Sequence, residues 1–244
     1  MLSLPFASNS KTHTMQKYCC IFFDLDRTLW DFEANSHEAF VDMYDKYELG
    51  KVFPDFATFE QTYRRYNRQL WEDYRNGKIA KEVLKYVRFQ MTLEAFGRNN
   101  LSLAKKLGED YVQISATKTQ LFPHTHELLA YLKERYRLFV ITNGFEEVQL
   151  KKIRNSALEG YFKGIITSEK AGVQKPHGEI FRYALEKAGA RAETSLMVGD
   201  DVEGDILGAR SQGMDQVLFN PNGKKHDVKP TYVIQDLSEL TKLI

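Results

Sequence analysis

Short apolar runs alternate with amphipathic helical patterns over the second half of the chain. The strand-like runs cover residues 137–142, 164–167, 195–199 and 215–219, with a weaker run at 231–234. The helical patterns lie at residues 125–135, 146–156, 178–188 and 203–212. Such alternation predicts an α/β fold, a Rossmann-like parallel sheet joined by right-handed crossovers.

One further apolar run, KYCCIFFD at residues 17–24, is typical of a strand that is buried on both faces. It must join the later strands, because a lone strand is not stable. Between them, apolar residues recur at helical spacing with almost no strand signal. We therefore predict a core domain from residues 17–32 and 119–244, with a helical cap domain, residues 33–118, inserted into it. Residues 1–16 are predicted to be a flexible tail.

Composition excludes several classes of partner. The chain has 34 basic and 33 acidic residues, so its formal charge of +1 gives no field that would attract a nucleic acid polymer. No stretch approaches the roughly 18 apolar residues of a membrane span. The adjacent cysteines, Cys19 and Cys20, have poor geometry for a mutual disulfide. These features predict a cytoplasmic protein that binds neither membrane nor nucleic acid, and they leave its oligomeric state open.

Polar residues follow the carboxyl ends of three predicted strands. They are Asp24, Asp26 and Thr28; Thr142, Asn143 and Gly144; and Asp200, Asp201 and Asp205. Ligands of open parallel sheets bind beyond these strand ends, so we expect the nine residues to gather in one crevice. Lys175, just before a predicted helix, is expected to point into the same crevice.

Clustered carboxylates repel one another unless a cation joins them, and a site rich in oxygen ligands suits Mg²⁺. Mg²⁺ with a lysine and a threonine is complementary to a phosphoryl group, whose charge spreads over three oxygens in the transition state. An aspartate nucleophile would form an aspartyl phosphate and split one difficult displacement into two easier ones. The pattern therefore favours phosphoryl transfer from a small phosphomonoester.

Four motifs in this order resemble those of the haloacid dehalogenase-like (HAD) hydrolase superfamily, and the match runs from about residue 17 to the end of the chain. The motifs are Asp24-x-Asp26-x-Thr28, Thr142-Asn143-Gly144, Lys175-Pro176 and Gly199-Asp200-Asp201-x3-Asp205. The resemblance implies that Asp24 is the nucleophile. It implies that Asp26 protonates the departing alkoxide and then takes a proton from the attacking water.

The same resemblance implies the remaining ligands of the site. Thr142, with Asn143 and Gly144, would bind the phosphoryl group, and Lys175 would hold nucleophile and phosphate together. The predicted Mg²⁺ ligands are the Asp24 carboxylate, the Asp26 backbone carbonyl and the Asp200 carboxylate. Asp201 or Asp205 would contact the metal through a water molecule, or would hydrogen-bond the residues that ligate it.

The superfamily also contains 2-haloacid dehalogenases, so the fold alone does not fix the reaction. A halide leaves without a proton, and dehalogenases of the superfamily lack an aspartate two residues after the nucleophile. Asp26 therefore favours a phosphatase. A non-catalytic binding module of the same fold is the other alternative, and the complete set of motif residues argues against it.

The inserted block occupies the position of a substrate-selecting cap. Its segment 70–77, Arg88-Phe89 and the core segment 141–145 resemble the pyrimidine 5′-nucleotidase branch, which implies nucleoside 5′-monophosphate substrates. Trp71, Tyr74 or Phe145 could stack on a base, and Arg88 could reach a phosphate or base oxygen. Sugar phosphates and phosphoglycolate are the alternative substrates, and the cap aromatics equally suit helix packing.

Overall fold

A six-stranded sheet forms the centre of the molecule. The structure is a computed structural model that describes residues 17–244, so the predicted tail, residues 1–16, lies outside the described residues. The strand order is β3-β2-β1-β4-β5-β6, and every neighbouring pair is parallel. The strands are β1 (Cys20–Phe23), β2 (Arg137–Thr142), β3 (Gly164–Thr167), β4 (Ser195–Gly199), β5 (Asp215–Phe219) and β6 (Tyr232–Ile234). The predicted Rossmann-like parallel sheet is confirmed.

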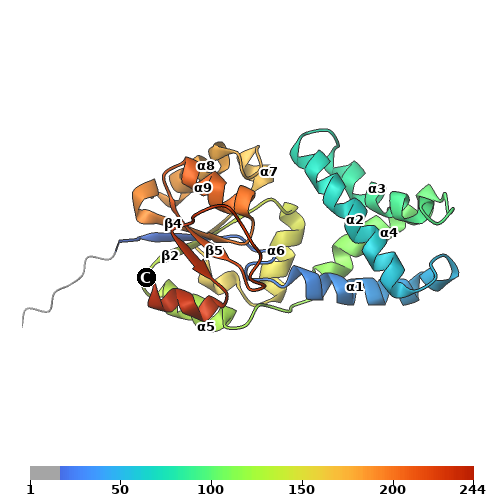
Figure 1. The fold of residues 1–244 in the computed structure, drawn as a ribbon, viewed down its shortest axis with the longest axis horizontal. Coiled ribbons are helices and arrows are strands. Elements are labelled where there is room, and N and C mark those ends of the chain that lie inside the picture. The colour runs from blue at the N-terminus through green and yellow to red at the C-terminus, as the bar shows by residue number, and fades with distance from the viewer. Residues whose placement is uncertain (1–16) are drawn as a thin grey trace, which may run out of the picture.

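Helices cover both faces of this sheet (Figure 1). The core helices are α5 (Thr125–Lys133), α6 (Glu146–Asn155), α7 (Ser168–Ala171), α8 (Gly178–Ala188) and α9 (Gly208–Ser211). Alternate residues of β1 point to opposite faces, because successive side chains of a strand do so. Ile21 and Phe23 join one apolar cluster, whereas Cys20 and Phe22 join another. The strand is therefore buried on both faces, as its apolar run predicts.

The predicted helix at residues 203–212 differs from the observed backbone. Residues Val202–Leu207 form a wide π-helical turn, η4, and only Gly208–Ser211 are α-helical. The carbonyl of Asp201 accepts hydrogen bonds from the backbone N–H groups of Asp205 at 2.8 Å and Ile206 at 3.2 Å. Such bulges recur at functional sites because they re-aim side chains. Here Asp205 lies within the wide turn.

A helical block is inserted between β1 and β2 and lies to one side of the core (Figure 1, right). Its helices are α1 (Phe32–Lys46), α2 (Phe56–Arg75), α3 (Lys81–Glu94) and α4 (Leu101–Ser115). Phe40, Phe59, Tyr63 and Phe89 form the centre of its own apolar cluster. This arrangement confirms the predicted helical insertion, whose limits stay those predicted from the sequence.

Short 3₁₀ segments complete the described elements: η1 (Leu49–Lys51), η2 (Glu159–Tyr161), η3 (Ala192–Thr194) and η5 (Leu237–Lys242).

Both cysteines are free thiols, Cys19 at the surface and Cys20 in the core. Within residues 17–244, no helix combines the length and apolar character that crossing a membrane requires.

Candidate active site

Asp24 lies one residue beyond the end of the central strand, at the bottom of the crevice between cap and core. It is buried, with only 7% of its surface exposed. Its Oδ1 accepts a hydrogen bond from Lys175 Nζ at 2.6 Å, and its Oδ2 accepts one from Thr28 Oγ1 at 3.4 Å. The position at a strand end and at the centre of the sheet is where ligands of this fold class bind.

Lys175 connects two strand ends. Its Nζ also donates to Asp205 Oδ1 at 2.6 Å and to the Ile141 carbonyl at 3.0 Å. Asn143 fixes its backbone, because Asn143 Nδ2 donates to the Lys175 carbonyl at 2.9 Å and Asn143 Oδ1 accepts from the Lys175 N–H at 2.8 Å. Burial lowers the pKa of Lys175, but Asp205 and Asp24 outweigh that effect and raise it above its ordinary value. Lys175 is therefore a fixed buried cation beside Asp24.

Three carboxylates offer oxygen atoms that all lie within 4.8 Å of one another: Asp24, Asp200 and Asp205. Gly199 gives this cluster its space, because a Cβ there would lie 2.1 Å from Asp205 Oδ2. Burial, together with the neighbouring carboxylates, raises the pKa of Asp24 and Asp205, and it raises that of Asp200 to about 7. A set of three close carboxylate oxygens fits a hard divalent cation such as Mg²⁺, which would relieve their mutual repulsion.

The other two predicted metal ligands have different positions. Asp201 lies outside this group, and its Oδ1 accepts hydrogen bonds from the N–H groups of Glu203 and Gly204, both at 3.0 Å. Its own N–H donates to Asp205 Oδ2 at 3.1 Å. Asp201 therefore caps η4 and orients Asp205. The role of the Asp26 backbone carbonyl stays a prediction.

The Asp26 carboxylate faces helix α6. Lys152 Nζ donates to its Oδ1 at 2.5 Å, and Gln149 Nε2 donates to its Oδ2 at 2.7 Å. The sequence motifs contain neither partner. A signal was available, since the helical period places Gln149 and Lys152 on the same face as the buried residues Val148 and Ile153.

Thr142 ends β2 beside Asp26. Its Oγ1 accepts hydrogen bonds from the Gly144 N–H at 3.1 Å and from Gln149 Nε2 at 3.0 Å. Gly144 has to be a glycine, because a Cβ would lie 1.7 Å from Gln149 Nε2. The motif Thr142-Asn143-Gly144 thus contributes a hydroxyl oriented by Gln149, an amide that fixes Lys175, and the space that Gln149 occupies.

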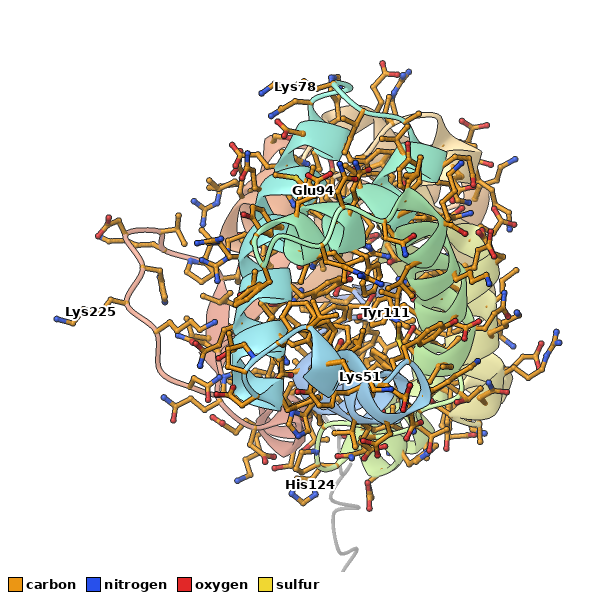
Figure 2. All side chains as sticks on the ribbon, turned by 90° about the vertical axis from the view of Figure 1, so that its right-hand side faces the viewer. Lys51, Lys78, Glu94, Tyr111, His124 and Lys225 are labelled. Atoms are coloured by element: carbon orange, nitrogen blue, oxygen red, sulfur yellow. The ribbon has the colours of Figure 1, made fainter. Side chains whose placement is uncertain are left out.

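A cavity of about 760 Å³ separates these core residues from the cap. Its cap wall comes from α1, α2 and α4 and includes Phe40, Tyr63, Asn67, Trp71 and Tyr111. Figure 2 looks onto the cap, where Tyr111 lies near the middle of the helices. The size falls within the range of small-molecule sites. Trp71 therefore lines the cavity, as its predicted role in substrate binding requires, and its ring stacks on Phe145 at 5.4 Å.

Arg88 is not among the residues that line this large cavity. Its side chain is buried inside the cap, where Nη1 donates to Asn67 Oδ1 at 3.0 Å. It does line a smaller cavity of about 50 Å³, together with Asp26, Trp71 and Gln149. Direct contact between Arg88 and substrate stays a prediction, and its observed contact is with Asn67, which faces the large cavity.

Three arginines that were not among the predicted site residues also line the large cavity. They are Arg64, Arg68 and Arg75 of α2. Arg64 is paired with Glu33 and with Glu60, whereas Arg68 and Arg75 have exposed side chains. Helical periodicity puts the three near one face of α2, but only the packing of the cap decides that this face meets the crevice.

The comparisons with known proteins agree with this geometry. Residues 18–213 match the family model described as "haloacid dehalogenase-like hydrolase". The chain belongs to this family. The matched residues include Asp24, Thr142, Lys175 and Asp200, and the expected family membership is confirmed.

Relatives named for different substrates have similar sequence identity to this HAD-like hydrolase. It is 34% identical to pyrimidine 5′-nucleotidase YjjG of Escherichia coli, over 93% of this chain and 98% of that protein. It is 30% identical to ribulose-1,5-bisphosphate 5-phosphatase of Halopiger xanaduensis, over 92% and 98%. The crystal structure of the HAD-hydrolase YfnB of Bacillus subtilis, bound to magnesium, superposes with a TM-score of 0.85 at 30% identity, over 93% and 98% of the chains.

The raised pKa of Asp200 leads to a prediction about metal binding. Without metal, the folded protein keeps a proton on Asp200 up to about pH 7, whereas the unfolded chain loses it at lower pH. Because the folded state then binds more protons, stability without metal falls as pH rises between these values. A Mg²⁺ ion bound by Asp200 would have to displace this proton, so it would stabilise the fold more above pH 7 than below.

We expect the Mg²⁺-induced rise in unfolding temperature to be larger at about pH 8.5 than at about pH 5.5. Thermal unfolding with Mg²⁺ and with EDTA at both pH values measures it. The variant Asp200→Asn should lose most of the Mg²⁺ effect at both. An equal Mg²⁺ effect at both pH values would contradict the assignment of Asp200 to the metal.

Proposed function

We propose that this hydrolase is a Mg²⁺-dependent phosphatase that transfers the phosphoryl group of a nucleoside 5′-monophosphate to Asp24 and then to water. The observation that carries the proposal is the pairing of buried Asp24 with Lys175 beside the carboxylates of Asp200 and Asp205. This arrangement combines a nucleophile, a fixed cation and a Mg²⁺ site at the bottom of a cavity of about 760 Å³.

In the first half of the reaction, Asp24 attacks phosphorus while the bond from phosphorus to the alkoxide oxygen breaks. Lys175 holds the attacking carboxylate and offsets its repulsion from the phosphoryl oxygens. Thr142 Oγ1 lies where it can donate its proton to one of those oxygens, because its two observed contacts are ones in which it accepts. Asp26 gives its proton to the departing alkoxide.

In the second half, Asp26 is a carboxylate and takes a proton from water as the water attacks the aspartyl phosphate. Inorganic phosphate leaves, Asp24 is regenerated, and Asp26 is again protonated. Bound Mg²⁺ would be held by Asp24, Asp200 and Asp205 and would neutralise charge on the phosphoryl oxygens. The cap forms the opposite wall of the cavity, and a substrate bound between cap and core would displace water from the site.

Asp26 also argues against a dehalogenase and against a binding module. A halide leaves as a stable anion and takes no proton, so a doubly hydrogen-bonded acid beside the nucleophile would have no function there. A binding module has no need of a nucleophile held by a buried lysine. Both features are those of a phosphomonoesterase that must protonate an alkoxide.

The cap wall supports a nucleoside as the leaving group. Aromatic side chains at Phe40, Tyr63, Trp71 and Tyr111 line the cavity. Aromatic rings favour planar, π-rich ligands, and Asn67 offers an amide to the same space. Sugar phosphates and phosphoglycolate would instead use the charged side chains of the same cavity, among them Arg64, Arg68 and Arg75, and they are the alternative that the following test separates.

The test is phosphate release from nucleoside monophosphates, sugar phosphates and phosphoglycolate, each measured with Mg²⁺ and with EDTA. We expect the highest kcat/KM for pyrimidine 5′-monophosphates, with activity lost in EDTA. Trp71→Ala should raise KM for nucleotides more than for sugar phosphates. Highest kcat/KM on a sugar phosphate would overturn the nucleotidase proposal and leave the phosphatase proposal standing.

A further inference from the structure

Two buried donors of α6 hold the Asp26 carboxylate from both sides. Gln149 and Lys152 are one turn apart, and their residues are only 1% and 4% exposed. Lys152 Nζ contacts Oδ1 at 2.5 Å and Gln149 Nε2 contacts Oδ2 at 2.7 Å, so the carboxylate cannot rotate freely. A carboxylate has about four acceptor positions, and two donors leave room for the proton that Asp26 must exchange.

Gln149 also links Asp26 to the phosphoryl-binding hydroxyl. The same Nε2 that contacts Asp26 donates to Thr142 Oγ1 at 3.0 Å. The absence of a side chain at Gly144 is what lets Gln149 reach both residues. One amide therefore sets the distance between the group that moves the proton and the group that binds the phosphate.

Lys152 is buried between an aromatic ring and the Asp26 carboxylate. Its Nζ lies 3.8 Å from the centre of the Trp30 ring, and burial lowers its pKa, although Asp26 acts in the opposite direction. Among the described residues, Asp26 is the one carboxylate within ion-pair distance of Lys152. Burying an ammonium group is costly, and an apolar side chain would fill the same space without that cost. The ion pair with Asp26 therefore points to a role in the reaction rather than in packing alone.

We propose that Gln149 and Lys152 are positioning residues for proton transfer by Asp26. The assignment rests on the proposed phosphatase reaction. As the bond between phosphorus and the alkoxide oxygen breaks, the O–H bond of Asp26 breaks, and its proton passes to that oxygen. Asp26 changes from a neutral acid to a carboxylate, so its attraction to the Lys152 ammonium grows along the step. An interaction that is stronger in the transition state than in the ground state accelerates the reaction.

The leaving group provides the test. A nucleoside 5′-monophosphate releases an alkoxide that needs a proton, whereas p-nitrophenyl phosphate releases a stable anion that does not. The ratio of kcat/KM for these two esters isolates the first half of the reaction, because both esters form the same aspartyl phosphate and its hydrolysis comes after that half. We expect Lys152→Met to lower this ratio, alkyl over aryl, by about 10²-fold, the lower end of what general acid catalysis contributes.

Controls separate this role from a structural one. Partial unfolding lowers both kcat/KM values by the same factor and leaves the ratio unchanged. Lys151→Met removes the neighbouring lysine, which contacts Gln113 of the cap instead of Asp26, and should keep the wild-type ratio. Gln149→Met should lower the ratio in the same direction as Lys152→Met.

A double variant tests whether Lys152 acts through Asp26. In an Asp26→Asn background, adding Lys152→Met should change the ratio no further, because the residue that it positions is gone. A wild-type ratio in Lys152→Met, or an undiminished effect in the Asp26→Asn background, would overturn the assignment while the phosphatase proposal stands. A wild-type protein that hydrolyses neither ester would overturn both.

Discussion

Asp24→Asn is expected to reduce phosphate release by about 10⁴-fold or more, because an amide cannot act as the nucleophile that forms the aspartyl phosphate. The fold should survive this change. Burial and the carboxylates of Asp205 and Asp200 raise the pKa of Asp24, so the neutral amide removes repulsion, and Lys175 keeps its contact with Asp205. Steady-state phosphate release and thermal unfolding in EDTA measure the two effects separately.

The matched control for this variant is Asp227→Asn, at an exposed aspartate in the loop after β5. That loop extends from the body of the molecule near Lys225 (Figure 2). The control should keep wild-type activity and stability. Substantial phosphate release from Asp24→Asn, beyond what deamidation to aspartate explains, would show that another group is the nucleophile.

Lys175→Met should damage both activity and stability. The variant leaves Asp24 and Asp205 without their shared cation, and breaking a buried ion pair in this way typically costs about 3–5 kcal/mol. The loss should shrink as the pH falls, because protonated carboxylates no longer need the cation. Activity should fall by about 10²-fold or more, since the nucleophile loses the donor that holds it. Urea unfolding at several pH values, with parallel kinetics, measures these effects.

Lys170→Met is the comparison for Lys175→Met. Lys170 is exposed and its Nζ pairs with Glu146 Oε1 at 3.1 Å, and a surface pair of this kind contributes about 0–1 kcal/mol. If Lys175→Met unfolds at the same urea concentration as Lys170→Met, the buried cation is not what stabilises the crevice.

The core of the site could be predicted because strand order decides it. Asp24, Thr142 and Asp200 each follow a strand of one parallel sheet, and β1 lies between β2 and β4. Polar residues at these strand ends lie close together regardless of how the helices pack. The sequence also predicted β1 clearly, because a strand that is buried on both faces has an uninterrupted apolar run.

Other parts of the site depend on packing that the sequence pattern does not contain. Lys152 lies on a helix, and only the distance between α6 and the β1 loop brings its Nζ to Asp26. Asp205 rather than Asp201 joins the carboxylate cluster, and it lies in a π-helical turn where the sequence pattern predicted an α-helix. In the cap, the sequence pointed to Trp71 and Arg88, and the orientation of α2 places Arg68 and Arg75 beside Trp71 along the large cavity.

Trapping the covalent intermediate tests the central claim most directly. The protein is mixed with Mg²⁺ and p-nitrophenyl phosphate, quenched in acid, and treated with borohydride, which reduces an aspartyl phosphate to homoserine. Mass spectrometry of the peptide that contains residues 20–30 then locates the change. We expect homoserine at Asp24, dependent on both Mg²⁺ and substrate. Reduction at a different residue, or phosphate release with no reducible intermediate under any quench time, would contradict Asp24 as the phosphoryl acceptor.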